Sequence, residues 1–268
     1  MSVPLAVCAT PIGNLGDVTL RVLEELAAAE TVLCEDTRHT RALLARHGIQ
    51  ARLLSYHRHN EAGRVASLLP RLIGGERMAL VSDAGLPGVN DPGARIVAAA
   101  LAAGVAVTVL PGPSAVETAL VASGLAGDQY RFVGYLPRGE RARAALWLEL
   151  GSWSHPTVAF ESAKRLPASL ASLATVEPER LVAVCRELTK AFEEVVCEPA
   201  ATLADRYREA PRGEVTLVIG PSTRIADVEE AAAAVVELVA AGAPRGTAAT
   251  VVARLTGVPR NTLYRTSL

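Results

Sequence analysis

This sequence has few aromatic side chains and little net charge, and both shortages limit its function. Phe, Trp and Tyr make up 4% of the 268 residues, so the core must be built mainly from Val, Leu and Ala. The formal net charge is −1, which excludes a protein that binds polyanions with its whole surface. Any nucleic-acid role therefore needs a local basic patch, and that patch cannot depend on many stacking rings. Half of the residues are apolar, which excludes a largely disordered chain.

Cysteine is also scarce, and its placement excludes the usual covalent and metal frameworks. The four cysteines form no CxxC pair, and no histidine lies near them at the spacing of a metal site. We expect reduced structural thiols, with neither a disulfide framework nor a zinc site.

No targeting or membrane signature is present in the sequence. The N-terminus lacks the basic region and long apolar run of a signal peptide. The most apolar stretch, Ile96–Leu110, is too short to span a bilayer and contains Gly104. We therefore expect a cytoplasmic protein that does not contact a membrane.

In the first half of the chain, short apolar runs alternate with segments of helical periodicity. The runs expected to form strands are Leu5–Thr10, Thr31–Cys34, Met78–Val81 and Val105–Leu110. The segments expected to form helices are Thr19–Ala29, Thr40–His47, Arg64–Ile73 and Gly93–Ala103. This alternation predicts a parallel sheet covered by helices, and continuous apolar runs are typical of buried parallel strands.

After Pro113 the pattern changes, which predicts a second α/β domain. Ser114–Gly124 is expected to be helical. Further strands are expected at Phe132–Tyr135, Thr157–Phe160, Leu181–Cys185, Glu194–Val196 and Val215–Ile219. Further helices are expected at Arg141–Glu149, Leu166–Ala174 and Ala200–Tyr207. We expect a sheet with some antiparallel pairs in this half.

The tail predicts a small helical C-terminal module. Pro221–Thr223 is expected to be a linker, followed by a helix over Ile225–Ala241. Two short helices around the turn Thr256–Pro259 would form a helix-turn-helix. The predicted domains are residues 1–113, 114–222 and 223–268.

Three loops rich in glycine and proline follow strands of the first predicted sheet. They are ATPIGNLGD (Ala9–Asp17), SDAGLPGVNDPG (Ser82–Gly93) and PGPSA (Pro111–Ala115). Ligands of open parallel sheets bind at the carboxyl ends of the strands, and glycine lets the backbone approach a ligand closely. One such loop is more often a plain turn, but three at one sheet edge predict a binding site.

The loops also lack the fingerprints of pyrophosphate sites. The sequence has no GxxxxGK[ST], and no GxGxxG opens a helix, which disfavours a phosphate-binding NTPase. A nucleoside ligand without phosphates fits these loops better. Asp83 could bind a ribose hydroxyl or a ligand ammonium, while Ser82 and Ser114 could exchange hydrogen bonds with it.

Nine motifs occur in one order between Thr10 and Gly220. They are ATPIGNLGD, EDTRHTRALL, YHRHNE, SDAGLPGVNDPG, PGPSA, GYLPR, FESAKRL, CRELTKAFEE and GEVTLVIG. In this order they resemble the ribosomal RNA small subunit methyltransferase I family of the tetrapyrrole methylase superfamily. The resemblance implies two α/β domains of the tetrapyrrole methylase type with an intervening cleft, a homodimer, and S-adenosylmethionine in that cleft. It also implies 2′-O-methylation of a cytidine in 16S ribosomal RNA.

The same resemblance implies which residues contact S-adenosylmethionine. In the first domain these would be Pro11, Ser82, Asp83, Ala84, Val89, Ser114 and Ala115. In the second domain they would be Ser162, Leu188 and Val215. The sequence departs from the family at Leu86, where SDAGTP has Thr, and at Arg58, where YHEHNE has Glu. Both departures bear on substrate recognition more than on cofactor binding.

Methyl transfer from a sulfonium mainly requires alignment of the reactants, and no metal is expected. A ribose hydroxyl is a weak nucleophile, so a positioned base would help by about 10²–10⁴-fold. The candidates in polar motifs are Glu35, Asp36, Thr37, Arg38, His57, His59, Asn60, Glu61, Glu187 and Lys190. Our hypothesis places His57 or Asp36 near the acceptor and Arg38 and Lys190 on phosphate. Alternatively, Asp36–Arg38 and Glu187–Lys190 are ion pairs that hold loops in place.

Two basic clusters could form the local RNA surface. The first comprises Arg138, Arg141, Arg143, Lys164 and Arg165. The second comprises Arg245, Arg254, Arg260 and Arg265 in the tail, which has no acidic residue after Pro244. Such clusters neutralise phosphates, although a charge run is usually only a solvated helix face. RNA binding is slightly favoured for the first cluster, and the two alternatives are equal for the tail. The expected partner is 16S rRNA within the assembled small subunit, recognised by shape.

Two other functions remain open at this point. One is methylation of a tetrapyrrole, or of a modified amino acid on a translation factor, against which YHRHNE and EDTRHT argue. The other is a non-catalytic RNA-binding or assembly factor that keeps the cofactor pocket. Cofactor binding without turnover on isolated small subunits would favour this second alternative.

Overall fold

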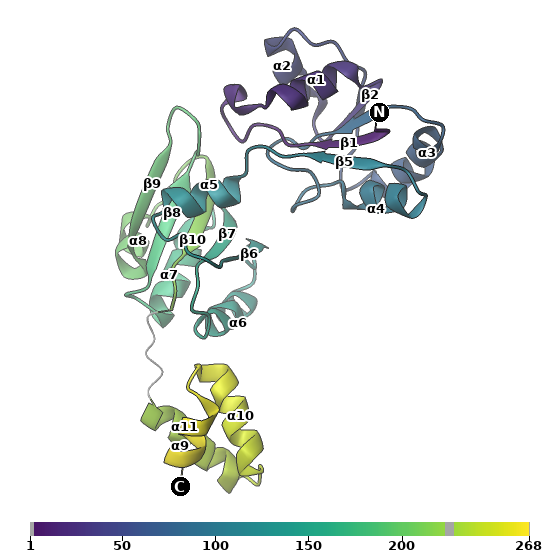
Figure 1. Cartoon of the computed structure of the whole chain (residues 1–268). Helices are drawn as coiled ribbons and strands as arrows, with labels where there is room; N and C mark the ends of the chain where they lie inside the picture. The colour runs from purple at the N-terminus through teal and green to yellow at the C-terminus, as the bar shows by residue number, and fades with distance from the viewer. Residues whose placement is uncertain (1–2, 223–227, 268) are drawn as a thin grey trace. The chain divides into compact units, whose positions relative to one another are not determined.

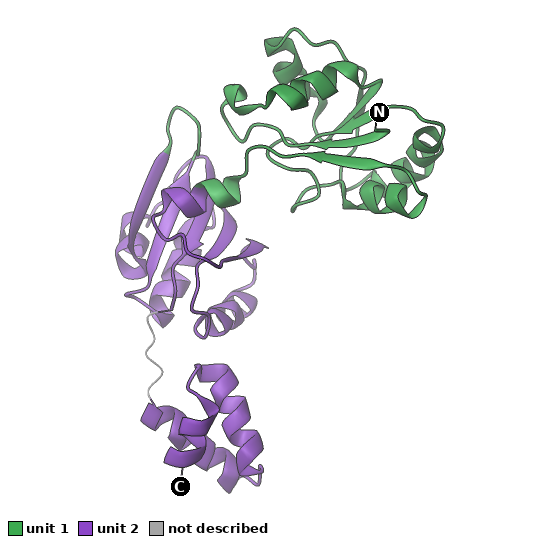
Figure 2. Ribbon diagram, in the orientation of Figure 1, with its two compact units in different colours: residues 1–118, 187–193 green, residues 119–186, 194–268 purple. Residues whose placement is uncertain are grey.

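The computed structural model describes residues 3–222 and 228–267. The chain forms two compact units, which are residues 1–118 with 187–193 and residues 119–186 with 194–268 (Figure 2). Residues 187–193 connect two strands of the second unit, yet their contacts group them with the first. In the described part of the chain, no helix is both long and apolar enough to cross a bilayer.

The first unit contains a five-stranded parallel sheet with strand order β3-β2-β4-β1-β5 (Figure 1). The strands are β1 (Leu5–Cys8), β2 (Thr31–Cys34), β3 (Leu53–Ser55), β4 (Met78–Leu80) and β5 (Val107–Leu110). Every residue of the three inner strands is buried, as expected for a parallel sheet covered on both faces. The predicted parallel sheet is therefore confirmed.

Helices cover both faces of this sheet. They are α1 (Leu20–Ala28), α2 (Thr37–Arg46), α3 (Glu61–Ile73) and α4 (Ala94–Ala102), with a short 3-10 helix, η1 (Leu15–Asp17), before α1. Val22 of α1 and Leu43 of α2 pack into one apolar core. Leu68 of α3 and Ile96 of α4 pack into the core on the opposite face. The loops at the carboxyl ends of the strands consequently gather at one edge of a three-layer unit.

The first unit differs from the predicted pattern in three places. Strand β3 carries no sequence signal, because it is short and only half-buried at the sheet edge. Helix α2 begins at Thr37 rather than Thr40, because the Asp36 carboxylate accepts a hydrogen bond from the backbone N–H of Arg38 and caps the helix. Helix α3 begins at Glu61, three residues before its expected start.

The second unit contains a five-stranded mixed sheet with strand order β6-β7-β10-β8-β9. The strands are β6 (Arg131–Tyr135), β7 (Thr157–Ser162), β8 (Leu181–Arg186), β9 (Glu194–Pro199) and β10 (Glu214–Ile219). The pair β6–β7 is parallel and the other three pairs are antiparallel, which confirms the expected antiparallel pairs.

Three helices of the second unit pack on one face of its sheet. They are α6 (Glu140–Leu150), α7 (Leu166–Val176) and α8 (Ala200–Arg206), and α5 (Ala115–Ala122) spans the boundary between the units. Trp147, Leu170 and Leu203 come from the three helices and share a core with Val184 and Leu217 of the sheet. Alternate residues of β8 and β10 contribute to this core, as the two-residue period of a strand requires.

A buried ion pair connects the ends of several helices and strands in this unit. Arg180 has no exposed surface, and its Nη1 lies 3.0 Å from Oε1 of Glu177. Its other N–H groups donate to the carbonyl oxygens of Gly220 at 2.9 Å and Leu150 at 3.3 Å. The second Glu177 oxygen accepts a hydrogen bond of 2.7 Å from Ser222 Oγ. The guanidinium group of Arg180 thus satisfies hydrogen-bond acceptors at the ends of α6 and β10 and in the turn after α7.

The tail folds as three short helices. They are α9 (Val228–Ala240), α10 (Arg245–Thr256) and α11 (Arg260–Thr266). Val235 and Leu263 belong to their shared core. Gly257 ends α10 with a φ of 75°, a conformation that favours glycine, so the predicted pair of helices around this turn is present. The expected start of the first helix at Ile225, and the end of the expected linker at Thr223, lie outside the described residues.

Candidate functional site

The three loops rich in glycine and proline contact one another at the carboxyl edge of the first sheet. The backbone N–H of Thr10 donates to the carbonyl of Gly85 at 2.8 Å, and the N–H of Gly85 donates back to Thr10 at 3.0 Å. Gly112 packs so closely on Ala9 that an added Cβ would lie 2.9 Å from the Ala9 Cβ. The first loop is therefore held between the second and the third.

Five of the predicted cofactor residues lie in the first two loops. Pro11 and Ser82 are buried, and Ser82 Oγ donates to the carbonyl of Ala84 at 3.2 Å. Asp83, Ala84 and Val89 are exposed, so a ligand at this edge can reach them. The structure thus brings these five residues to one edge of the sheet.

The other five predicted cofactor residues are divided between the units. Ser114 and Ala115 are half-buried at the start of α5, and Leu188 is buried in the loop 187–193 of the first unit. Ser162 ends β7 and is exposed, whereas Val215 is buried in β10. Both belong to the second unit, so their contact with the cofactor stays a prediction.

The loop 187–193 packs directly on the first glycine-rich loop. The backbone N–H of Asn14 donates to Thr189 Oγ1 at 3.0 Å. A Cβ on Gly13 would lie 2.6 Å from Lys190 Cγ and 2.8 Å from the carbonyl oxygen of Leu188. Only glycine fits this position without a shift of one of the loops.

We expect Gly13→Ala to destabilise the first unit by about 1–3 kcal/mol, because the added methyl group overpacks this contact. Chemical denaturation followed by circular dichroism measures the change. Gly63→Ala is the matched control, because Gly63 lies within α3 with open space around it, and alanine there should stabilise by about 0.5–1 kcal/mol. Equal stabilisation by both substitutions would contradict the proposed close packing.

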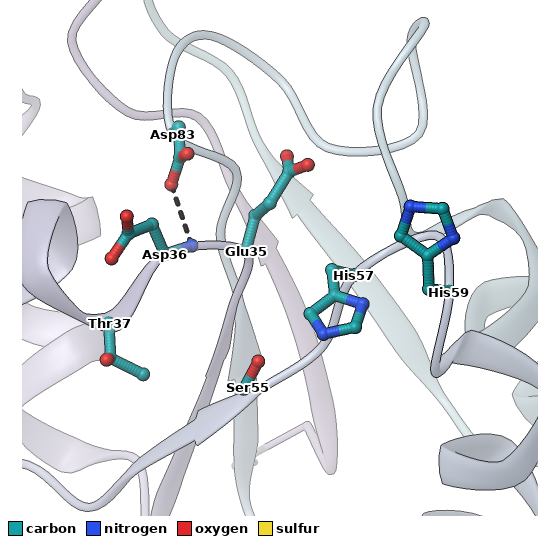
Figure 3. A pocket seen from close by; sticks show the side chains of 7 residues that line it. All are labelled: Glu35, Asp36, Thr37, Ser55, His57, His59 and Asp83. Carbon is teal, nitrogen blue, oxygen red and sulfur yellow. Dashed lines mark hydrogen bonds between the residues drawn. The ribbon is translucent and has the colours of Figure 1, made fainter.

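A polar pocket of about 440 Å³ opens at the same edge of the sheet, within the usual size range of small-molecule sites (Figure 3). Its lining follows β2, β3 and β4 and comprises Glu35, Asp36, Thr37, Ser55, His57, His59 and Asp83. Asp83 Oδ1 accepts a hydrogen bond of 2.9 Å from the backbone N–H of Asp36, which joins the ends of β2 and β4. The pocket brings together several predicted site residues.

The Asp36 carboxylate forms a salt bridge with Arg38. Its carboxylate accepts hydrogen bonds from the Arg38 side chain, with Nη2 at 2.6 Å, and from the Arg38 backbone N–H at 2.8 Å. The Arg38 guanidinium, together with that N–H, holds the pKa of the Asp36 carboxyl well below its usual range. Asp36 is therefore a weak base, and its geometry suits a helix cap.

His57 is held in one orientation by Asn60. The backbone N–H of His57 donates to Asn60 Oδ1 at 2.9 Å, so the Asn60 amide nitrogen faces His57 Nε2 at 3.2 Å and the Ser55 carbonyl at 3.2 Å. Because this amide nitrogen is a donor, Nε2 must accept, and the ring proton then lies on Nδ1. Nδ1 is buried and has no hydrogen-bond partner among the described residues. Neither ring nitrogen therefore offers a free lone pair to a substrate proton.

Glu35 has neither the ion pair of Asp36 nor the amide contact of His57 among the described hydrogen bonds and salt bridges. Its side chain points away from Asp36 and reaches between Asp83 and His59 (Figure 3). Burial, and next the negative charge of Asp83, raise the pKa of the Glu35 carboxyl. A carboxylate that is harder to keep ionised binds a proton more readily, so Glu35 is a stronger base than Asp36.

Asp91 and Ser55 belong to this edge and were not predicted from the sequence. Burial raises the pKa of Asp91 to about 6, and the charges of Glu35 and Asp83 add to that rise. The only local signal for Asp91 was its place in the second glycine-rich loop. Ser55 ends β3, the strand that has no sequence signal, so its position depended on the sheet.

We expect Asp91→Asn to stabilise the protein at pH 7.5 and to have little effect near pH 4. The raised pKa means that the stability contributed by protonated Asp91 is complete below pH 3.8 and is lost as the pH rises through about 6. Thermal unfolding at both pH values should show a gain of at least about 2 °C only at the higher pH. Asp128→Asn, at an exposed position, is the control. Identical gains at both pH values would contradict the raised pKa.

Other predicted candidates hold the loops in place. Glu61 is buried and accepts hydrogen bonds from Tyr56 Oη at 3.1 Å and from the backbone N–H of Gly93 at 3.0 Å, which ties α3 to the second loop. Lys190 Nζ lies 2.9 Å from Glu187 Oε1. Both ion pairs of the alternative interpretation are therefore present, and contacts of Arg38 and Lys190 with phosphate stay predictions.

The first basic cluster is only partly available to a partner. Arg138, Arg141 and Lys164 are exposed, but Arg143 is buried within α6. Arg165 forms a salt bridge with Glu161 and donates to the carbonyl of Leu136 at 3.1 Å.

Comparison with family models and relatives covers nearly the whole chain. Residues 4–204 match the model for Tetrapyrrole (Corrin/Porphyrin) Methylases, and residues 226–268 match the RsmI C-terminal HTH domain. A protein from Mesorhizobium japonicum, named Ribosomal RNA small subunit methyltransferase I, is 43% identical over 97% of this chain and 90% of its own length. Proteins of the same name from Micromonospora olivasterospora and Escherichia coli O157:H7 are 46% and 39% identical over 95% and 98% of this chain, and 83% and 94% of their own lengths.

Solved structures share the fold at low identity. The methyltransferase CobJ aligns with a TM-score of 0.64 and 19% identity over 82% of this chain and 95% of its own. Uroporphyrin-III C-methyl transferase from Thermus thermophilus, complexed with S-adenyl homocysteine, aligns with a TM-score of 0.57 and 19% identity over 82% of this chain and 99% of its own. The fold and the family predicted from the motifs are confirmed, and this chain belongs to the ribosomal RNA small subunit methyltransferase I family of the tetrapyrrole methylases.

Proposed function

We propose that this protein transfers the methyl group of S-adenosylmethionine to the ribose 2′-hydroxyl of a cytidine in 16S ribosomal RNA. The observation that carries the proposal is the 43% identity over 97% of the chain to a relative named for small-subunit rRNA methylation. The joined loops and the polar pocket at the carboxyl edge of the first sheet support it.

The residues at this edge fit S-adenosylmethionine, which carries a positive sulfonium and a positive amino group. Three carboxylates, Glu35, Asp83 and Asp91, lie close together: the charge of Asp83 adds to the raised pKa of Glu35, and the charges of Glu35 and Asp83 add to the raised pKa of Asp91. A bound cation would neutralise this excess negative charge. Gly112 and Gly85 let the backbones of the first, second and third loops approach closely, which shapes the edge before a ligand arrives.

The ten residues predicted from the family motifs would hold the cofactor. They are Pro11, Ser82, Asp83, Ala84, Val89, Ser114, Ala115, Ser162, Leu188 and Val215. The tight contact of Gly13 with the loop that carries Leu188 supports the assignment of Leu188, because it fixes that loop against the first glycine-rich loop.

S-adenosylmethionine supplies a methyl group that its sulfonium already activates. The protein must hold the ribose hydroxyl in line and accept its proton, and Glu35 is the residue to which we assign proton removal. Its raised pKa and its position in the pocket support this assignment over Asp36, whose carboxylate is paired with Arg38. His57 would line the pocket near the acceptor rather than take its proton, because Asn60 occupies its Nε2 lone pair and its Nδ1 is buried.

Arg38 and Lys190 would contact phosphates of the substrate. Arg38 is exposed, so its guanidinium can meet a phosphate while it remains paired with Asp36. Lys190 is half-buried beside Gly13 and paired with Glu187, so it would act as a point charge near the loops.

The decisive experiment supplies methyl-labelled S-adenosylmethionine to small subunits that lack the modification. We expect label in one 2′-O-methylcytidine of 16S rRNA, identified by nuclease digestion and mass spectrometry. Subunits that already carry the methyl group are the control and should accept none. Label on a base or on a protein would contradict the proposal, and cofactor binding without turnover would favour a non-catalytic assembly factor.

The setting of the reaction follows from the same proposal. We infer an assembled small subunit as the partner, a homodimer as the active form and the cytoplasm as the location, where ribosomal subunits are present in bacteria. We also propose domains of residues 1–113, 114–222 and 223–268. The change of sequence pattern after Pro113 supports the first boundary, and the separate family matches to residues 4–204 and 226–268 support the second.

A further inference from the structure

The exposed face of α11 has an unusual composition. Arg260, Asn261, Tyr264 and Arg265 are all exposed, while Leu263 is buried in the helical core. At 100° per residue, the four exposed side chains lie within about 140° of the helix circumference, so they share one face. Two arginines, an amide and an aromatic ring on one helix face are the residue types that contact nucleic-acid backbones and bases.

Two arginines from different helices flank the same aromatic ring. The guanidinium carbon of Arg245, at the start of α10, lies 4.8 Å from the centroid of the Tyr264 ring, and that of Arg260 lies 5.8 Å from it. Arg260 Nε donates to Thr250 Oγ1 at 3.0 Å, and Arg245 Nη2 donates to the carbonyl of Tyr264. These contacts fix the guanidinium groups and leave further N–H donors for a ligand, which lowers the entropy lost on binding.

The arginines around this face form no salt bridge with the glutamates of α9 among the described residues. No Asp or Glu occurs after Glu237 in the sequence, whereas Arg245, Arg254, Arg260 and Arg265 all do. Across the described residues 228–267, none of these arginines forms a salt bridge. This contrasts with Arg165 and Arg186 of the second unit, which are both paired with glutamates. An unpaired cluster of guanidinium groups is complementary to phosphates.

We propose that the face formed by Arg245, Arg260, Asn261, Tyr264 and Arg265 binds the phosphodiester backbone of folded RNA. Guanidinium groups bind phosphate oxygens with two hydrogen bonds, and the Tyr264 ring holds two of these groups side by side on the face. The choice of RNA over other polyanions rests on the proposed function, because the substrate named there is RNA. The face supplies the local basic patch that a chain with a net charge of −1 requires.

The test measures RNA affinity of the full chain against salt. The variant Arg260→Gln/Arg265→Gln removes two exposed charges of the face, and Arg21→Gln/Arg46→Gln removes two exposed charges of the first unit as a matched control. Fluorescence anisotropy with a labelled 16S rRNA fragment gives the dissociation constant at several salt concentrations. We expect the face variant to bind about tenfold more weakly at low salt and to have a salt slope smaller by about 1–2.

Three outcomes would overturn the inference: wild-type affinity and slope in the face variant, an equal loss in the control variant, or a loss confined to duplex DNA. A separate assay of methyl transfer over a range of small-subunit concentrations keeps the two proposals distinguishable. We expect the face variant to raise KM for the subunits and to leave kcat unchanged. If the wild-type protein transfers no methyl group while the face variant still loses RNA affinity, only the proposed function fails.

Discussion

Glu35→Gln is expected to lower the rate of methyl transfer by about 10²–10⁴-fold, the usual contribution of a general base. The substitution keeps the size and shape of the side chain but removes its negative charge and its ability to take a proton. Single-turnover transfer to small subunits measures the effect, and calorimetry with S-adenosylmethionine measures cofactor binding. We expect the dissociation constant for the cofactor to change far less than the rate, since Asp83 and Asp91 remain.

Asp36→Asn is the matched control for this prediction. Asparagine caps a helix about as well as aspartate, so α2 should keep its start at Thr37. If Glu35 is the base, Asp36→Asn retains most of the activity. A large loss in Asp36→Asn together with normal turnover in Glu35→Gln would instead assign the proton transfer to Asp36.

The pH dependence of turnover independently tests the assignment of Glu35 as the base. Because burial raises the pKa of Glu35 above its ordinary value, turnover should fall as the pH is lowered through that raised pKa. The acid limb of the profile should disappear in Glu35→Gln, because the residual reaction no longer depends on that carboxyl. A residual limb at the same pH would show that another group titrates.

Arg180→Met is expected to destabilise the second unit by about 3–5 kcal/mol, because it leaves the buried Glu177 carboxylate without its cation. The carbonyls of Gly220 and Leu150 lose their donors at the same time. Urea unfolding followed by tryptophan fluorescence measures the change. The sequence has two tryptophans, Trp147 and Trp153, and both lie in this unit.

Arg208→Met is the matched control, because Arg208 forms an exposed ion pair with Asp205. Such surface pairs contribute about 0–1 kcal/mol, so this variant should unfold nearly as the wild type does. A second comparison is Arg180→Met/Glu177→Met, which removes both charges and should recover part of the lost stability. A loss below about 1 kcal/mol in Arg180→Met would mean that water satisfies Glu177 and that the pair is not a dry contact.

Local signals in the sequence were strongest where burial is continuous. The inner strands of the first sheet are fully buried, so their apolar runs were unambiguous, and the alternation with helices indicated a parallel sheet. Strand β3 was missed because its three half-buried residues gain their conformation from pairing with β2. The start of α2 was placed late, since capping by Asp36 depends on one side-chain hydrogen bond.

For the candidate site, too, the sequence predicts the general location and the structure reveals the details. The glycine-rich loops and the acidic motif after β2 predict one edge of the sheet, where the polar pocket lies, because parallel strands bring their carboxyl ends together. The ranking of bases within that edge could not be obtained from residue types. Asp36, Glu35 and His57 were all candidates, and their neighbours in the structure distinguish them: Arg38 for Asp36, Asp83 for Glu35 and Asn60 for His57.

The amino-acid order alone determined the family, the two α/β sheets and the sheet edge at which the polar pocket lies, because ordered motifs and hydrophobic periodicity are local properties of the chain. Tertiary structure decided which pocket carboxylate has a raised pKa, why Gly13 must be glycine and which of the described arginines form no salt bridge. These properties depend on distances between residues far apart in sequence, such as Gly13 and Lys190 or Arg245 and Tyr264. Electrostatic and packing energies change over a few ångströms, and only the folded chain sets such distances.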